Sequence, residues 1–267
     1  MNKNKIIDLW KQAGWNNVAD YHNDISVKSC RALEYQDLTN LLNPCKVSPK
    51  TFWKATDEWF KTDTVCNTLL NKDKNDSISK ANFENNKIAL YSGLLGLVEW
   101  GIANCNFRFG ATSIGEIGCG YGSFYEHFAK DRTIRYVGFD VVKRFDKCVE
   151  VKGRDGTFTK TQIKEYKNKI NLFYSCNVFQ HLVPNIIEKY IKQAYEILPV
   201  GGVAVFAYIN APEPTISFHY GQIVDIMPTN DFYEMCEALG FTIETKIEQK
   251  IKGNKTFNLA CVYLTKF

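Results

Sequence analysis

The sequence predicts an α/β protein with a mostly parallel sheet and an α-helical cap at its N-terminal side. At residues 113–128 a short apolar strand leads into alternating glycines and then into a helical pattern. From there strand and helix patterns alternate, which is typical of a parallel sheet with helices on both faces. The first 110 residues show helical patterns instead. We therefore expect a helical cap over residues 1–87 and an α/β domain over residues 88–267.

Composition excludes several classes of protein. The 267 residues carry a net charge of +4, and 45% of them are hydrophobic, which suffices for a globular core. The nine cysteines are scattered without a Cys-x-x-Cys pair and no secretory signal is evident, so we expect reduced thiols in a cytoplasmic protein without a metal site. The apolar runs are too short to cross a bilayer, so no membrane segment is expected. The oligomeric state stays open.

The first 110 residues are expected to contain several amphipathic helices and show no recognisable chemistry. One helix begins near Ile6, another follows Ser48-Pro49, and a long helix covers residues 88–105. The aromatic residues between 52 and 60 either line a substrate pocket or form the cap's own core. Both interpretations remain open.

The glycine-rich stretch carries the strongest motif in the chain. Glycine allows positive φ and lets a ligand lie directly on the backbone. The dinucleotide fingerprint Gly-x-Gly-x-x-Gly would need glycine at 123, where the chain has Ser123. The pattern Glu-x-Gly-x-Gly-x-Gly resembles the first motif of the class I S-adenosylmethionine-dependent methyltransferases. This resemblance implies S-adenosylmethionine as cofactor, bound by Glu116, Gly118, Cys119, Gly120 and Gly122.

A second strand is expected at residues 135–140, ending in an acidic residue. A carboxylate at the carboxyl end of this strand can accept the ribose hydroxyls of an adenosine, and Asp140 matches the family's second motif. We therefore expect Asp140 and Val141 at the cofactor, with a helix N-cap as the structural alternative for Asp140. The short spacing to the next clear strand leaves the third strand unplaced. Asp155 either faces the adenine or serves a turn.

The stretch 170–182 resembles the fourth strand and following turn of small-molecule methyltransferases. The resemblance implies that Cys176, Asn177 and Val178 line the cofactor, and Asn171 stands where the family pattern has Asp. Enzymes that methylate the amines of bases or of glutamine carry an Asp/Asn-Pro-Pro motif at this strand end. The absence of proline there argues against that class and favours a hydroxyl or the amine of a small molecule.

The C-terminal third completes the resemblance. Pro199 and the paired glycines at 201–202 resemble the family's turn into strand five. A helix is expected from Asp231 to Leu239, with a capping box between Asp231 and Glu234. Strands at 241–247 and 257–264 should form an antiparallel hairpin. The resemblance implies a Rossmann-like, mostly parallel seven-stranded sheet with an antiparallel last strand.

Together these features predict transfer of a methyl group from S-adenosylmethionine to a small-molecule or glycan acceptor, at a hydroxyl oxygen. Two histidines are candidates for the proton acceptor: His219, in the segment after strand five, and His181, after strand four. A nucleic-acid partner is not expected. Two alternatives remain open: an NAD(P)-dependent oxidoreductase or epimerase, although the chain has no Tyr-x-x-x-Lys motif, and a non-catalytic nucleoside-binding module.

Overall fold

The computed structural model describes residues 77–120, 122, 124–129, 133–176, 178–179, 182, 184–210, 215–219, 222–226, 228–250 and 258–267. Most of the expected cap, including the helices near Ile6 and Ser48, lies outside the described residues. Its last part belongs to helix α6 (Ser77–Phe109), which continues across the expected boundary at residue 87.

A seven-stranded sheet forms the centre of the described chain, and it confirms the predicted fold class. The strand order is β3-β2-β1-β4-β5-β9-β8, and β9 is antiparallel to both of its neighbours. The antiparallel last strand of the prediction is therefore present. The strands are β1 (Ser113–Ile117), β2 (Arg135–Asp140), β3 (Cys148–Glu150), β4 (Leu172–Ser175), β5 (Val203–Asn210), β8 (Phe241–Lys250) and β9 (Asn258–Lys266).

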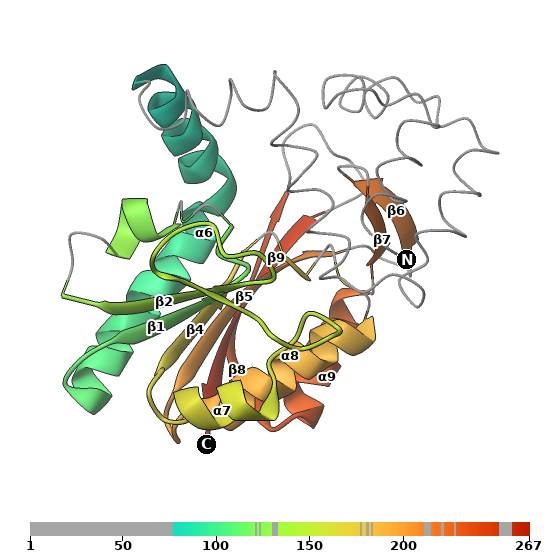
Figure 1. Cartoon of the computed structure of the whole chain (residues 1–267). Coiled ribbons are helices and arrows are strands. Elements are labelled where there is room, and N and C mark those ends of the chain that lie inside the picture. Colours follow the sequence, from blue (N-terminus) through green and yellow to red (C-terminus); the bar gives the residue numbers. More distant parts are fainter. Residues whose placement is uncertain are drawn as a thin grey trace.

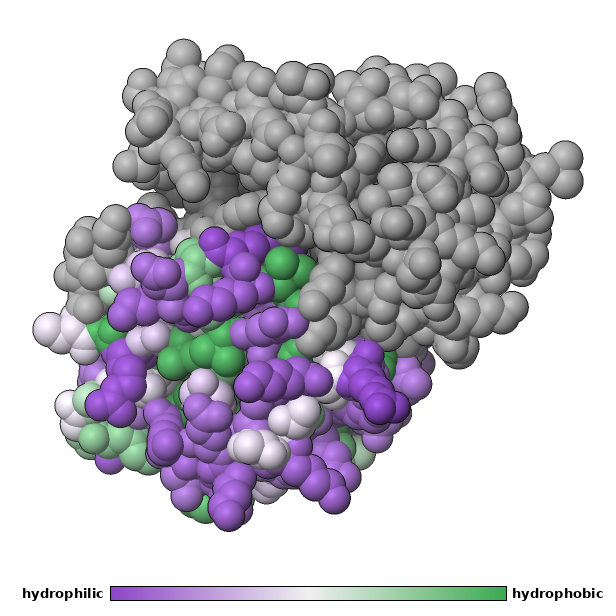
Figure 2. Space-filling model, viewed as in Figure 1, coloured by the Kyte–Doolittle hydropathy of each residue, from purple (hydrophilic) through white to green (hydrophobic). Residues whose placement is uncertain are grey.

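Helices cover both faces of this sheet (Figure 1). Helix α6 packs on one face against β4, β5, β8 and β9, while α7 (Lys160–Tyr166), α8 (Pro184–Ile197) and α9 (Thr229–Ala238) gather on the other. Every residue of β1 and β4 is buried, as expected for central parallel strands. In Figure 2 the described hydrophobic residues gather in a central area of the visible face, with hydrophilic residues around it.

Helix α6 is longer than the expected helix at 88–105. Its buried residues Leu94, Val98, Ile102 and Cys105 follow the helical repeat and face the sheet. The helix ends at Gly110, whose φ of 74° and N–H bond to the carbonyl of Asn106 close the last turn. No helix among the described residues is long and apolar enough to span a bilayer.

The structure places the one strand that the sequence left unplaced, and it differs from three local expectations. The unplaced third strand is β3, and residues 141–147 connect it to β2 without a helix. The segment after β5, expected as a loop, contains a two-stranded hairpin of β6 (Thr215–His219) and β7 (Gln222–Ile226). The helix after the glycines is the five-residue π-helix η1 (Tyr125–Ala129). Helix α9 begins after Pro228 without a side-chain cap, so the predicted capping box is wrong.

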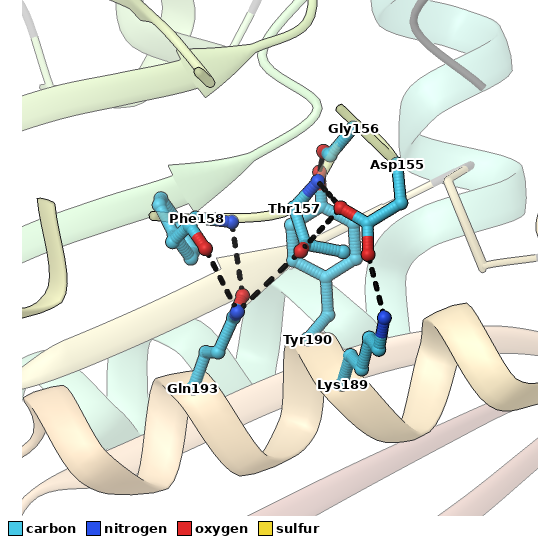
Figure 3. A network of polar contacts seen from close by, with 7 residues as sticks. All are labelled: Asp155, Gly156, Thr157, Phe158, Lys189, Tyr190 and Gln193. Carbon is cyan, nitrogen blue, oxygen red and sulfur yellow. Dashed lines mark hydrogen bonds and ion pairs between the residues drawn. The ribbon is translucent and has the colours of Figure 1, made fainter. Parts of the chain in front are cut away.

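The loop between β3 and α7 is fixed to α8 by polar contacts (Figure 3). The side-chain amide of Gln193 accepts a hydrogen bond from the N–H of Phe158 and donates one to its carbonyl, both at 3.0 Å. The buried hydroxyl of Tyr190 donates to the carbonyl of Gly156. Two side chains of one helix therefore replace the backbone partners that this loop lacks.

Asn171 joins the amino-terminal ends of β1 and β4. Its side-chain oxygen accepts from the N–H of Ser113 at 2.8 Å, and its side-chain nitrogen donates to the carbonyl of Ala111 at 2.7 Å. An aspartate could accept the first bond but could not donate the second. The departure from the family pattern is therefore explained by two opposite partners that only an amide satisfies.

We expect Asn171→Asp to lower the free energy of unfolding by about 1–3 kcal/mol, because a buried carboxylate would face the carbonyl of Ala111 without a donor. Denaturant unfolding of the variant measures this loss. The matched control is Asn168→Asp, at an exposed position, where we expect a change within about 0.5 kcal/mol. Equal effects of the two substitutions would contradict the role assigned to Asn171.

Candidate active site

The glycine-rich loop leaves β1 at its carboxyl end and is held against β2. The N–H groups of Gly118 and Cys119 both donate to the carbonyl of Phe139, at 2.7 and 3.2 Å. Gly118, Gly120 and Gly122 have φ values of 72°, 53° and 81°, in the region that favours glycine. The loop therefore turns sharply beside the carboxyl end of β2, the edge at which ligands bind in open parallel sheets.

The three glycines serve different purposes. A Cβ on Gly118 would lie 2.2 Å from Cγ2 of Val178, and one on Gly122 would lie 2.9 Å from the ring of Phe145. These two glycines are needed because other side chains pack on them. Apart from its own and adjacent residues, a Cβ on Gly120 would meet no atom of the described part of the chain within 4 Å. Only Gly120 thus presents an open stretch of backbone on which a ligand could lie.

Asp140 lies directly beside this open backbone. Its Oδ2 accepts a hydrogen bond from the N–H of Gly120 at 2.9 Å, and its Oδ1 accepts from the N–H of Val142 at 3.1 Å and from Nη1 of Arg144 at 2.9 Å. A carboxylate accepts about four hydrogen bonds. Since these three are the contacts of Asp140 among the described residues, one acceptor position remains, on the oxygen that faces Gly120.

Sequence reasoning missed Arg144 and Phe145. The side chains of Arg144 and Asp140 form an ion pair and are only 9% and 11% exposed. Phe145 packs on Gly122. The spacing of four between Asp140 and Arg144 was the available signal for the ion pair, whereas nothing in the sequence pointed to Phe145.

Glu116 is buried under aromatic rings. It accepts a hydrogen bond from the hydroxyl of Tyr136, and the rings of Phe124 and Tyr174 stack with centroids 4.1 Å apart. Burial and the Glu116 carboxylate raise the pKa of Tyr136, so its hydroxyl stays protonated and donates. This contact joins the side chains of the neighbouring strands β1 and β2. Whether Glu116 also contacts the cofactor stays a prediction.

The remaining predicted site residues are placed as follows. The side chain of Val178 packs against Gly118 of the loop. Val141 is buried directly after β2. Cys176 is half-buried after β4. Asn177 and His181 lie outside the described residues. The backbone of His219 ends β6, opposite Gln222, in the hairpin that replaces the expected loop.

Asp155 has its own partners. Its carboxylate accepts from the N–H and the hydroxyl of Thr157 at 3.1 and 2.8 Å, and from Nζ of Lys189 at 2.6 Å (Figure 3). Burial opposes ionisation of Asp155, but these donors outweigh it and lower the pKa of the carboxyl. This geometry agrees with the turn interpretation of Asp155.

Comparison with known protein families identifies the fold and its chemistry. The family described as Methyltransferase domain matches residues 108–246, more than half of the chain. The chain belongs to the class I S-adenosylmethionine-dependent methyltransferase family. The predicted family is thereby confirmed, and the match includes the glycine loop and Asp140. No curated protein sequence matches this methyltransferase.

Several solved structures resemble the methyltransferase in part. The 1,6-didemethyltoxoflavin-N1-methyltransferase of Burkholderia thailandensis is 12% identical, with a TM-score of 0.47 over 64% of this chain and 79% of that one. The phosphoethanolamine N-methyltransferase 2 of Haemonchus contortus is 15% identical, with a TM-score of 0.44 over 63% of this chain and 52% of that one. The methyltransferase thus spans about half the length of the second enzyme. These partial likenesses do not identify an acceptor.

The residues present fit S-adenosylmethionine, the cofactor of this family. An adenosine needs a surface free of side chains and an acceptor for its ribose hydroxyls. The open backbone at Gly120 supplies the surface, and the remaining acceptor position on Asp140 Oδ2 lies beside it. Without displacing a protein donor, Asp140 can accept one ribose hydroxyl.

We expect Gly120→Ala to fold but to bind S-adenosylhomocysteine at least about tenfold more weakly. The new methyl group would occupy the open surface, and among the described residues no atom beyond the adjacent ones lies within 4 Å of it. The positive φ alone should cost about 1–2 kcal/mol of stability. Calorimetric titration measures the affinity, and thermal unfolding measures the stability.

Gly118→Ala is the matched control, since it adds the same methyl group at a similar φ. That group would collide with Val178, so Gly118→Ala should mainly lose stability. Unchanged cofactor affinity in Gly120→Ala would show that the ligand does not lie on this backbone.

Proposed function

We propose that this methyltransferase transfers the methyl group of S-adenosylmethionine to a hydroxyl oxygen of a small molecule or glycan. The observation that carries the cofactor part is the pairing of the Asp140 carboxylate with the N–H of Gly120, at the one glycine of the loop with open space beside it. We assign cofactor binding to this pair, with Glu116, Gly118, Cys119, Gly122, Val141, Cys176, Asn177 and Val178 around it.

In this proposal the protein acts mainly by alignment. S-adenosylmethionine, when bound, supplies a methyl group on a sulfonium, which leaves as a neutral thioether in a direct displacement. Asp140 orients the ribose, and the glycine loop fixes the cofactor at the sheet edge. The acceptor must then be held in line and protected from water, which accounts for a large share of such a rate enhancement. Residues 1–87 would cover the acceptor side.

The end of β4 argues against the exocyclic amine of a base as the acceptor. Ser175 is fully buried there, and its hydroxyl donates to the carbonyl of Ile117 at 3.2 Å. The side chain at this strand end is thus used inside the sheet and cannot hold an amine. Together with the absence of proline in the Ser-Cys-Asn-Val stretch, this favours a hydroxyl over the exocyclic amine of a base.

The test is methyl transfer by the full chain. It is incubated with S-adenosylmethionine labelled with carbon-13 in the methyl group and with an extract of small molecules and glycans. We expect labelled products whose carbon-13 shift is that of a methyl ether. Methyl groups on nitrogen would refute the oxygen acceptor, and binding of NAD without any transfer would favour an oxidoreductase.

We also propose that His219 accepts the hydroxyl proton, and we expect His219→Asn to slow turnover by roughly 10²–10⁴-fold at unchanged cofactor affinity. The histidine ends β6 beside the hairpin turn, and its partner in register is Gln222. Single-turnover kinetics measure the effect.

The control for His219 is Gln222→Asn, which changes the opposite strand and should keep most of the rate. His181→Asn tests the second histidine in parallel. If His219→Asn retains more than about a tenth of the wild-type rate, the base is not His219, and alignment alone would have to explain catalysis.

A further inference from the structure

Two buried thiols meet behind the glycine loop. The Sγ atoms of Cys119 and Cys148 are 3.4 Å apart, and the two residues are 4% and 1% exposed. Cys119 lies between Gly118 and Gly120 in the loop, and Cys148 is the first residue of β3. The thiols thus connect the loop after β1 with the edge strand β3.

The meeting point is created by Gly138 on β2. Cys148 is the register partner of Gly138 in the β2–β3 pair, and a Cβ on Gly138 would lie 2.7 Å from Sγ of Cys119. The missing side chain therefore lets the loop thiol reach across β2 to the thiol of β3. The Cys119 thiol donates to Cys148 Sγ, and the Cys148 thiol donates to the carbonyl of Val142 at 3.7 Å.

We propose that Cys119 and Cys148 form an oxidisable dithiol, and that the disulfide between them weakens cofactor binding. A disulfide has an S–S length of about 2.05 Å, so the sulfur atoms must approach by more than 1 Å. Both are held by backbone that is already hydrogen-bonded, the loop to Phe139 and β3 to β2. Closing the bond therefore pulls on the loop.

The oxidation requires a disulfide oxidant, for example oxidised glutathione. A thiolate of one cysteine attacks one sulfur of oxidised glutathione, forming a mixed disulfide and releasing one glutathione thiolate. The second cysteine then attacks the protein sulfur of that mixed disulfide and releases the other glutathione. The hydrogen bond from the Cys119 thiol outweighs burial and lowers the pKa of Cys148, which makes Cys148 the first thiolate.

The effect on the cofactor follows from the position of Cys119. The next residue, Gly120, donates its N–H to Asp140, and this bond sets the acceptor beside the open backbone. A shift of the loop towards β3 displaces that N–H. Loss of one hydrogen bond to a charged group corresponds to about tenfold in affinity. This consequence rests on the proposed cofactor site, whereas formation of the bond does not.

The experiment uses the full chain in glutathione redox buffers. The disulfide is mapped by mass spectrometry of peptides without reduction, and affinity for S-adenosylhomocysteine is measured by calorimetry before oxidation, after it, and after reduction with dithiothreitol. We expect a Cys119–Cys148 bond and about tenfold weaker, reversible binding. By reciprocity, saturating S-adenosylhomocysteine stabilises the reduced form and should raise the midpoint potential of the pair by about 30 mV.

Two variants locate the effect. Cys148→Ala should abolish the oxidative loss of affinity, while Cys236→Ala, which removes another buried thiol in α9, should leave that loss intact. Absence of the Cys119–Cys148 peptide after oxidation would refute the site, and its presence with unchanged affinity would refute the coupling. If the reduced chain fails to bind S-adenosylhomocysteine, the proposed function fails, but the mapped disulfide still decides whether the pair is oxidisable.

Discussion

The hydrogen bond between the Gly120 N–H and the Asp140 carboxylate is the contact on which the candidate site depends. It joins the loop after β1 to the end of β2, and it turns one carboxylate oxygen towards the only open glycine of the loop. Without this bond the loop would keep its shape through Phe139, but the acceptor would no longer be fixed beside the exposed backbone. The site is thus set by one bond between two neighbouring strand ends.

The short connection between β2 and β3 lies next to that hydrogen bond. Because residues 141–147 contain no helix, the chain stays close to the glycine loop and contacts it repeatedly. Arg144 pairs with Asp140, Phe145 packs on Gly122, and Cys148 meets Cys119. The contacts of Phe145 and Cys148 limit how far the loop can move. Because the two segments are so close, a covalent bond between the two cysteines would also change the affinity for the cofactor.

Local patterns were enough to predict the sheet and the position of Asp140. The alternation of apolar strands and helices fixes a parallel sheet, and the bounds of β2 follow from its apolar run between Arg135 and Asp140. These features depend on nearby residues, which a sequence displays directly.

Other features depend on residues that are distant in the sequence. Strand β3 has only three residues and is a strand because it pairs with β2. Three residues are too few to show the alternating pattern of a strand in the sequence. The need for glycine at 118 comes from Val178, sixty positions later. The capping box failed for a local reason, since α9 already begins at Thr229, two residues before Asp231. For β3 and Gly118, tertiary packing decided the outcome.

The central claim is that Asp140 holds a ribose hydroxyl of the cofactor. Calorimetric titration of the wild-type chain and of Asp140→Ala with S-adenosylhomocysteine and with its 2′- and 3′-deoxyribose analogues tests it, with Asp146→Ala as the exposed control. We predict that at least one analogue binds the wild type roughly 5- to 100-fold more weakly than the parent ligand, while Asp140→Ala does not distinguish that analogue from the parent. Equal discrimination by the wild type and Asp140→Ala would contradict the assignment.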